Sequence, residues 1–230
     1  MLTHPAWSGL TGIRHGFLDR AECATRADGE AWEPVVAAAG TPLPVSTVKQ
    51  VHGIRVVTAD RDRETVVADG VATAAAGLVV GVVTADCVPC LVLARGLRGP
   101  VVAAVHAGWR GAAAGILEAA VSHLGSAFGV EPRNIEVCLG PAVGPCCYRV
   151  GDEVHAAFVG RTGQSTAPAW REQGDALMLD LRLASRLLLE AAGVASVTVL
   201  GPCTVCTPSY ASYRRDGPGA GRQLSFIART

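Results

Sequence analysis

The hydrophobic pattern of the chain is dominated by short apolar runs that are rich in β-branched residues and bounded by glycine, proline or polar residues. Such runs are typical of buried strands. The pattern predicts strands at residues 78–83, 91–94, 101–105, 135–139 and 197–200. The last two runs each end in Gly-Pro and lead into a loop that contains cysteine, which hints at an internal duplication.

A second periodicity, with apolar residues three or four positions apart, predicts helices outside these runs. The expected helices cover residues 31–39, 112–128, 152–159 and 181–192, and a glycine directly follows both the first and the last. The polar segment 160–174 is expected to form a loop.

The order of these elements predicts an α+β fold. No low-complexity linker divides the sequence, and 230 residues can bury a sizeable core without splitting. We therefore expect one α+β domain over residues 1–230, with mixed β-sheets and helices on the outside. The order of the strands does not follow from the pattern.

Composition narrows the classes of partner. Half of the residues are hydrophobic and the formal net charge is zero, so there is no general attraction to nucleic acid or to an acidic membrane surface. The first residues lack a basic, apolar leader, and no apolar stretch approaches the roughly 18 residues that span a bilayer. We expect a cytoplasmic protein, a monomer or small homo-oligomer, that acts on small molecules.

Reactive side chains follow two of the predicted strands. Cys87 lies just after the run at 78–83, and His106 directly follows the run at 101–105. A short apolar segment also precedes His52. Because a rigid sheet can position groups at strand ends, these three side chains suggest a transition-metal site with one vacant position. Their spacing matches no short zinc-finger signature.

The remaining cysteines offer weaker alternatives. Eight cysteines in a chain with a large core are expected to be reduced thiols rather than a disulfide framework. Cys87 and Cys90 form a C-x-x-C pair, as do Cys203 and Cys206, but a four-cysteine zinc site from these two pairs is unattractive across the long interval between them. The adjacent Cys146-Cys147 is expected to be a pair of reduced packing residues near the site.

Basic and aromatic residues flank the candidate site. Arg110 stands near a predicted helix start, where free N–H groups and a guanidinium can bind an anion. Trp109 could belong to the core or form a stacking surface. Lys49 is the single lysine, so its position before the segment of His52 is either functional or chance. The segment 209–217, together with Gly221-Arg222, contains three arginines and is either a solvated basic turn or a phosphate or ribose contact.

Four strings along the chain carry a family resemblance. KQVHG, TADCVP, HAGWRG and GPAVGPCCY, in that order, resemble the YfiH/YlmD laccase-domain family, historically described as multicopper polyphenol oxidases. The Ser-Tyr-Arg-Arg core near the C-terminus is also similar, whereas residues 18–23 depart from the family pattern. The resemblance implies a YfiH-like fold and a zinc-dependent purine nucleoside phosphorylase, with adenosine deaminase and methylthioadenosine phosphorylase activities.

The resemblance also implies roles for particular residues. Zn²⁺ would be the cofactor, with Cu²⁺ able to replace it in vitro, and purine nucleosides and phosphate would be the partners. A metal-activated water would explain deamination. The implied metal ligands, also catalytic, are His52, Cys87 and His106. The further catalytic residues are Arg110 and Arg215, and the substrate-binding residues are Lys49, Gln50, Trp109, Cys147, Tyr148 and Arg214.

Two other functions remain open from the sequence. A copper-dependent polyphenol oxidase with a mononuclear and a trinuclear centre needs about ten imidazoles, but the chain has six histidines. Of these, His123 and His155 are expected to be surface or structural residues, and His4 and His15 are uninformative. A non-catalytic role in peptidoglycan quality control is the third alternative.

Overall fold

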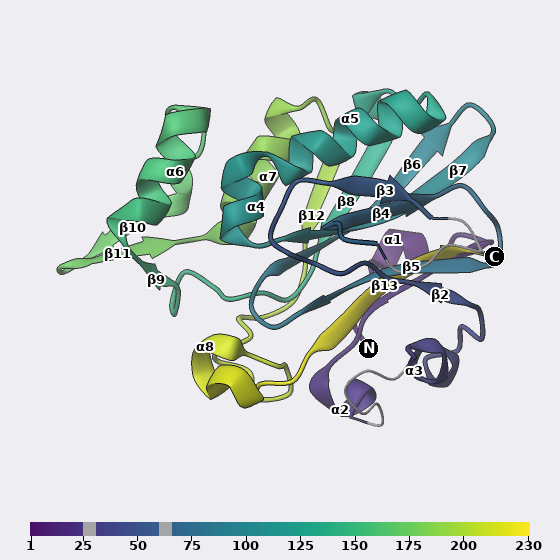
Figure 1. Cartoon of the computed structure of the whole chain (residues 1–230), viewed down its shortest axis with the longest axis horizontal. Coiled ribbons are helices and arrows are strands. Elements are labelled where there is room, and N and C mark those ends of the chain that lie inside the picture. Colours follow the sequence, from purple (N-terminus) through teal and green to yellow (C-terminus); the bar gives the residue numbers. More distant parts are fainter. Residues whose placement is uncertain (25–30, 60–65) are drawn as a thin grey trace.

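Two mixed β-sheets lie face to face in the computed structural model, which describes residues 1–24, 31–59 and 66–230 (Figure 1). The six-stranded sheet has the order β12 (Ser196–Val199), β8 (Ile135–Leu139), β6 (Val88–Gly96), β7 (Gly99–Ala107), β4 (Gly70–Thr73) and β3 (Val56–Thr58). The four-stranded sheet has the order β1 (Ile13–Phe17), β13 (Gln223–Arg229), β5 (Leu78–Thr84) and β2 (Val45–Ser46).

The centre of the larger sheet is the antiparallel hairpin of β6 and β7. Gly99 has a φ of 113° in its turn, a conformation that glycine adopts without strain. On the far side of β6, strand β8 pairs antiparallel with it, and β12 pairs parallel with β8. Parallel neighbours bring their carboxyl ends to the same edge, so the loops that follow β8 and β12 start side by side.

Helices cover the outer faces of both sheets. Those of the larger sheet are α4 (Trp109–Ala114), α5 (Ile116–Phe128) and α7 (Leu181–Ala191), which Figure 1 shows along one face. The shorter helices are α1 (Pro5–Ser8), α2 (Arg20–Cys23), α3 (Glu33–Ala38) and α8 (Tyr213–Asp216). The 3-10 turns are η1 (Pro132–Asn134), η2 (Ala167–Ala169) and η3 (Gly217–Gly219).

Three apolar clusters hold these layers together. Val92 and Leu117 belong to the cluster between the larger sheet and its helices, and Val82 and Leu91 to the one between the two sheets. The third cluster lies outside the smaller sheet and includes Phe226. Strands β5, β6 and β7 are therefore buried on both faces, which explains why they appear in the sequence as continuous apolar runs.

A smaller unit projects at one end of the sandwich. It contains α6 (Asp152–Thr162) and a three-stranded sheet in the order β10 (Trp170–Gln173), β11 (Ala176–Leu179) and β9 (Arg149–Val150). The predicted loop at 160–174 is therefore wrong in part, because α6 extends through its first residues and β10 forms its last ones. The exposed residues of β10 gave no apolar run to detect.

The predicted α+β class with mixed sheets and outer helices is confirmed, and each of the predicted strands is present within a few residues. The helix predicted at 112–128 is instead two helices, because Gly115 adopts a left-handed φ of 107° between them. That the domain extends over all of residues 1–230 stays a prediction. Among the described residues, no helix has the length and apolar character needed to cross a bilayer.

Candidate active site

Three soft ligand side chains meet at one end of the sandwich. Cys87 lies in the turn that carries the chain from β5 to β6, and His106 lies near the end of β7, paired with Pro89 at the start of β6. His52 comes from the loop before β3. One ligand atom from each lies within 4.8 Å of the others, and the Sγ of Cys87 is 3.8 Å from the Nε2 of His52.

Asp69 is the carboxylate that arranges two of these ligands. It is fully buried, and its Oδ1 lies 2.8 Å from the Nδ1 of His106. The same carboxylate accepts hydrogen bonds from the backbone N–H groups of His52 at 2.8 Å and Gly53 at 2.7 Å. Because Nδ1 of His106 is engaged, its Nε2 is available to a ligand, the usual role of a carboxylate behind a metal-binding imidazole.

The electrostatics of the cluster favour a thiolate at Cys87. Burial by itself would raise the pKa of this thiol, but hydrogen bonds with His106 and then His52 outweigh burial and lower the pKa to about 6. Burial likewise opposes the protonated form of His106, yet Asp69 and Cys87 raise its pKa to about 9. Near neutral pH the metal-free cluster therefore holds a thiolate beside a cationic imidazole, and a divalent cation can replace that proton.

Backbone geometry makes the cluster compact. His52 has a left-handed φ of 61°, which is uncommon for a residue with a Cβ and is held here by the Asp69 hydrogen bonds. Gly108, at the N-cap of α4, lies so close to the ligands that an added Cβ would stand 2.6 Å from Cδ2 of His52 and 3.0 Å from Sγ of Cys87. Only glycine leaves room for both side chains.

The three side chains fit a transition metal. Two imidazole nitrogens and one thiolate form a borderline-soft donor set, which suits zinc and leaves one tetrahedral position for water or substrate. The cluster is thus a group of Cys and His residues that could hold a metal ion, as the sequence predicted.

The cluster forms one wall of a pocket of about 660 Å³. Nine of the eleven predicted site residues line this pocket, namely Lys49, Gln50, His52, Cys87, His106, Trp109, Arg110, Tyr148 and Arg214. The side chain of Gln50 is fixed against strand β5, because its amide makes two hydrogen bonds of 2.8 Å with the backbone of Val83. It therefore shapes the wall and has little freedom to bind substrate.

Arg215 and Cys147, the other two residues that the sequence placed in the site, do not line this pocket. The guanidinium of Arg215 donates to the carbonyl oxygens of Thr204 and Tyr210, each at 2.8 Å, and also contacts Asp216. Its donors are thus used to fasten the C-terminal loops. Sγ of Cys147 lies 3.4 Å from Sγ of Cys206, in a separate group of cysteines.

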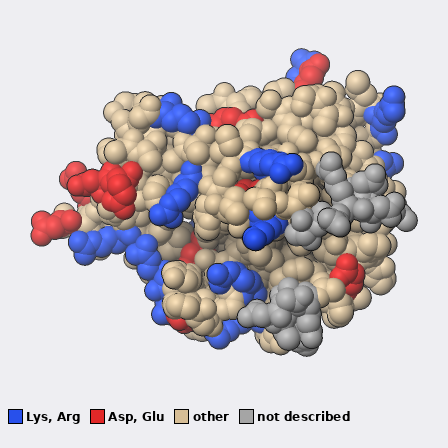
Figure 2. Space-filling model, in the orientation of Figure 1, with Lys and Arg blue, Asp and Glu red and all other residues tan. Residues whose placement is uncertain are grey.

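Cationic and aromatic side chains surround the remaining pocket. The guanidinium of Arg110 stacks 4.4 Å from the ring centroid of Trp109, and that of Arg214 lies 5.3 Å from the ring of Tyr148. Lys49 joins these two arginines at the pocket wall. Figure 2 shows Lys and Arg side chains around α8, whereas Asp and Glu gather at the end that carries the β10–β11 hairpin.

The anion site predicted at a helix start stays a prediction, and the structure changes the helix on which it was based. Helix α4 begins at Trp109 rather than at residue 112 and contains only six residues. Its N-terminal partial charge is correspondingly small. An anion bound at this position would therefore depend on the guanidinium of Arg110 more than on the helix.

Sequence reasoning missed several residues of the site. Asp86 has a φ of 87° and accepts hydrogen bonds of 2.6 Å from the hydroxyl of Thr204 and from the N–H of Arg214. It thereby ties the turn before Cys87 to the C-terminal loops. Asp69 had a usable signal, a lone carboxylate inside the apolar string VVADGVA. Gly108 had no signal of its own, since glycines are common in the neighbouring sequence. Arg222, which the sequence grouped with the basic C-terminal segment, also lines the pocket.

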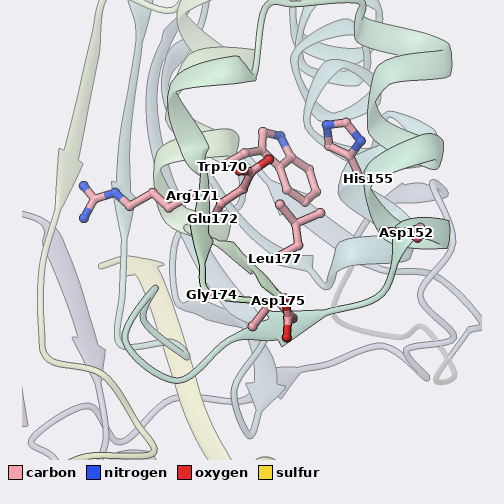
Figure 3. Close-up of a pocket in the computed structure, with 9 residues that line it drawn as sticks. Asp152, His155, Trp170, Arg171, Glu172, Gly174, Asp175 and Leu177 are labelled. Atoms are coloured by element: carbon pink, nitrogen blue, oxygen red, sulfur yellow. The ribbon is translucent and has the colours of Figure 1, made fainter.

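A second hollow, of about 640 Å³, lies between α6 and the β10–β11 hairpin (Figure 3). His155, Trp170 and Leu177 lie close to one another there (Figure 3), and Asp152 and Asp175 also line the hollow. It contains no group of metal-binding residues, and its carboxylates would repel an anion. The pocket at the Cys and His cluster is therefore the better candidate for the active site.

Comparison with known proteins identifies the family of this chain and agrees with its fold. Residues 28–230 match the family described as multi-copper polyphenol oxidoreductase laccase, and the chain belongs to this family. It is 42% identical to a purine nucleoside phosphorylase of Pseudomonas aeruginosa, over 79% of this chain and 73% of that protein. It is 40% identical to one of Mycobacterium bovis, over 83% of this chain and 75% of that protein.

The solved structures of this group have the same architecture. YlmD from Geobacillus stearothermophilus matches with a TM-score of 0.82 at 29% identity, covering 98% of this chain and 94% of the other. A Neisseria meningitidis protein matches with a TM-score of 0.78 at 31% identity, covering 97% and 96%. The predicted YfiH-like fold is thereby confirmed.

Proposed function

We propose that this protein is a purine nucleoside phosphorylase whose reaction takes place in the pocket beside His52, Cys87 and His106. The observation that carries the proposal is that these metal-binding side chains share one pocket with cationic and aromatic groups. Phosphorolysis calls for an anion site for phosphate, a surface for the base and groups that stabilise the negative charge on the departing base. The curated relatives at about 40% identity, which are named purine nucleoside phosphorylases, support the same activity.

Phosphate is assigned to the cationic side of the pocket. Arg110, Arg214, Arg222 and Lys49 line it, and the Asp86 carboxylate nearby is already occupied by hydrogen bonds. A guanidinium binds a phosphate oxygen pair through two parallel hydrogen bonds, which gives both attraction and orientation. Arg215 is left out of this assignment because its donors are used within the protein.

The nucleoside is assigned to the aromatic and apolar side. Tyr148 and Tyr213 present rings to the pocket, and Val83 and Val143 add apolar surface. The buried hydroxyl of Thr84 also lines it and has no hydrogen-bond partner in the part of the chain that the structure describes. A ribose or base can satisfy this hydroxyl, since unpaired buried groups are costly.

A zinc ion held by His52, Cys87 and His106 is part of the proposal. When bound, it would supply Lewis acidity that stabilises negative charge and lowers the pKa of a ligand water. Asp69 orients the imidazole of His106, and Gly108 keeps the ligands close together. Deamination of adenosine to inosine and ammonia, with consumption of water, is the side activity that such a centre would allow.

Copper-dependent oxidation of phenols is the less favoured function. Two of the six histidines belong to the cluster, and the other four lie elsewhere: His15 accepts the N–H of His4, while His123 bonds to Thr58 and His155 packs on Trp170. Copper can still occupy the same three ligands, because the affinity order places Cu²⁺ above Zn²⁺. Such a single site lacks the trinuclear centre for four-electron reduction of oxygen.

The test compares arginine variants of the zinc-loaded protein. Replacing a guanidinium that binds phosphate, as in Arg110→Ala, should raise the KM for phosphate about 10- to 100-fold and change the KM for inosine far less. Arg171→Ala, at the distant hollow, is the matched control. Equal effects of both variants would refute the assignment of the phosphate site. Deamination is measured separately, as the ammonia released from adenosine in the absence of phosphate.

A further inference from the structure

A second group of four cysteines lies outside the active-site cluster. Cys146 and Cys147 follow β8, and Cys203 and Cys206 follow β12. All four Sγ atoms lie within 4.8 Å of one another, and Sγ of Cys206 is 3.6 Å from that of Cys146 and 3.4 Å from that of Cys147. None of the four is in a disulfide.

The sheet topology brings these cysteines together. Strands β8 and β12 are parallel neighbours, so both loops leave the same edge of the sheet, and Ala142 and Cys203 continue the pairing as a bridge. Gly144 allows the closest approach, because a Cβ there would lie 3.0 Å from Cβ of Cys203. Its N–H donates to Sγ of Cys203 at 3.1 Å, a contact typical of a sulfur with thiolate character.

Packing alone does not explain the group. A reduced cysteine that serves as a small apolar residue is normally buried, as Cys90 and Cys138 are in the sheet. Cys146 and Cys206 are instead exposed, and Cys147 and Cys203 are only partly buried. Four thiols that converge at the surface gain little from burial, so their convergence calls for a ligand.

The spacing of the sulfurs suits a single tetrahedral ion. With Zn–S bonds of about 2.3 Å, the sulfurs of a tetrahedral site are about 3.8 Å apart. The sulfur separations of 3.4 and 3.6 Å, and the outer limit of 4.8 Å, lie around that value. All-sulfur tetrahedral sites take zinc or iron, and the affinity order for divalent ions favours zinc over iron.

We propose that Cys146, Cys147, Cys203 and Cys206 bind one zinc ion in a closed structural site. Four protein ligands leave no position for substrate, so this ion stabilises the fold and takes no part in the reaction. The site is independent of the proposed enzymatic function. The ion would join two loops that also reach the active-site pocket. Val143 of the first loop lines that pocket, and the hydroxyl of Thr204 in the second loop donates to Asp86 at 2.6 Å.

The first test is the zinc content of the full-length protein, purified under reducing conditions and measured by mass spectrometry. Wild type should contain two equivalents of zinc, and the double variant Cys203→Ser/Cys206→Ser should contain one. His106→Ala, which disrupts the active-site cluster, should also contain one. Cys138→Ala, a buried cysteine outside both groups, is the matched control and should contain two. An undiminished zinc content in the double variant would overturn the proposal.

The second test remains decisive if the double variant does not fold. Zinc X-ray absorption of His106→Ala should show a first shell of four sulfurs at about 2.3 Å, because the four-cysteine site would hold the remaining ion. Nitrogen or oxygen in that shell, iron in place of zinc, or no metal at all would overturn the proposal. So would a thiol titration of the unfolded, chelator-treated wild type that finds fewer than eight thiols, since disulfides would then account for the convergence.

Discussion

The Oδ1 of Asp69 lies 2.8 Å from the Nδ1 of His106, and neither side chain is appreciably exposed to solvent. The same carboxylate receives the backbone N–H groups that fix the loop of His52. One buried anion thus sets the position of two residues of the candidate metal cluster, one from a loop and one from a strand. The arrangement of the cluster depends on this residue as much as on the ligands.

Asp69→Asn should therefore weaken metal binding without removing a ligand. The amide keeps the shape of the carboxylate but loses its charge and part of its hydrogen-bonding capacity, and such changes behind a ligand cost about 10- to 100-fold in metal affinity. Competition with a chelator of known affinity measures this. Asp152→Asn, at the distant hollow, should leave the affinity unchanged. If Asp69→Asn binds zinc as tightly as wild type does, Asp69 does not position the ligands.

Gly108→Ala tests the close packing around the cluster. The added Cβ would stand 2.6 Å from Cδ2 of His52, closer than real Cβ contacts, and at a tight 3.0 Å from Sγ of Cys87, so the His52 ring must shift. A displacement of about 1 Å can lower catalytic efficiency on the order of 100-fold. Gly160→Ala in α6 is a matched control, because nothing lies within 4 Å of its added Cβ. The measurement is kcat/KM together with zinc content, and two equally active variants would contradict the structure.

Arg215→Ala should affect stability rather than phosphate binding. Its guanidinium bonds to the carbonyl oxygens of Thr204 and Tyr210, so its removal leaves those groups without their donor. We expect the melting temperature to fall by a few degrees. The KM for phosphate should stay within about twofold of the wild-type value. A large rise in that KM with an unchanged melting temperature would restore Arg215 to the phosphate site.

Because His15 is buried, we expect the protein to lose stability in mild acid. Burial, and then the charge of His4, lowers the pKa of His15 from its ordinary value of 6.5 to about 4. Between these two values the unfolded chain binds more protons than the folded one, so the free energy of unfolding falls as the pH decreases from about 6.5 to about 4.

Urea unfolding at pH 7.5 and pH 5 measures this effect. His15→Gln keeps an acceptor for the N–H of His4 but removes the titrating group. The pH-dependent loss of stability should therefore be smaller in the variant than in wild type. An identical loss in both proteins would show that other groups cause it.

The strands and the convergence of His52, Cys87 and His106 could be predicted from the sequence for a physical reason. Strands buried on both faces appear as continuous apolar runs, and a Cys or His directly beyond such a run stands out. Asp69 was missed because its importance comes from hydrogen bonds to segments distant in the sequence. The orientation of Arg215 depends in the same way on carbonyl groups of a loop whose path the pattern does not reveal.

The four-cysteine group could not be predicted from the sequence for a similar reason. The sequence showed that the strands around 135–139 and 197–200 both lead through Gly-Pro into loops with cysteine. It did not show that these strands are parallel neighbours, which is what joins Cys146 and Cys147 to Cys203 and Cys206. The combination considered from the sequence paired the latter two with Cys87 and Cys90 instead. Strand order decides such long-range pairings, and local periodicity does not contain it.

The most direct test of the proposed activity measures whether inorganic phosphate is consumed. Zinc-loaded protein is incubated with inosine and inorganic phosphate, and ³¹P NMR is recorded while hypoxanthine is measured in parallel. Phosphorolysis predicts that inorganic phosphate disappears and ribose 1-phosphate appears in equal amount to the free base. Release of hypoxanthine with no change in the phosphate signal would mean hydrolysis, and no release of base from inosine or adenosine would contradict the proposed function altogether.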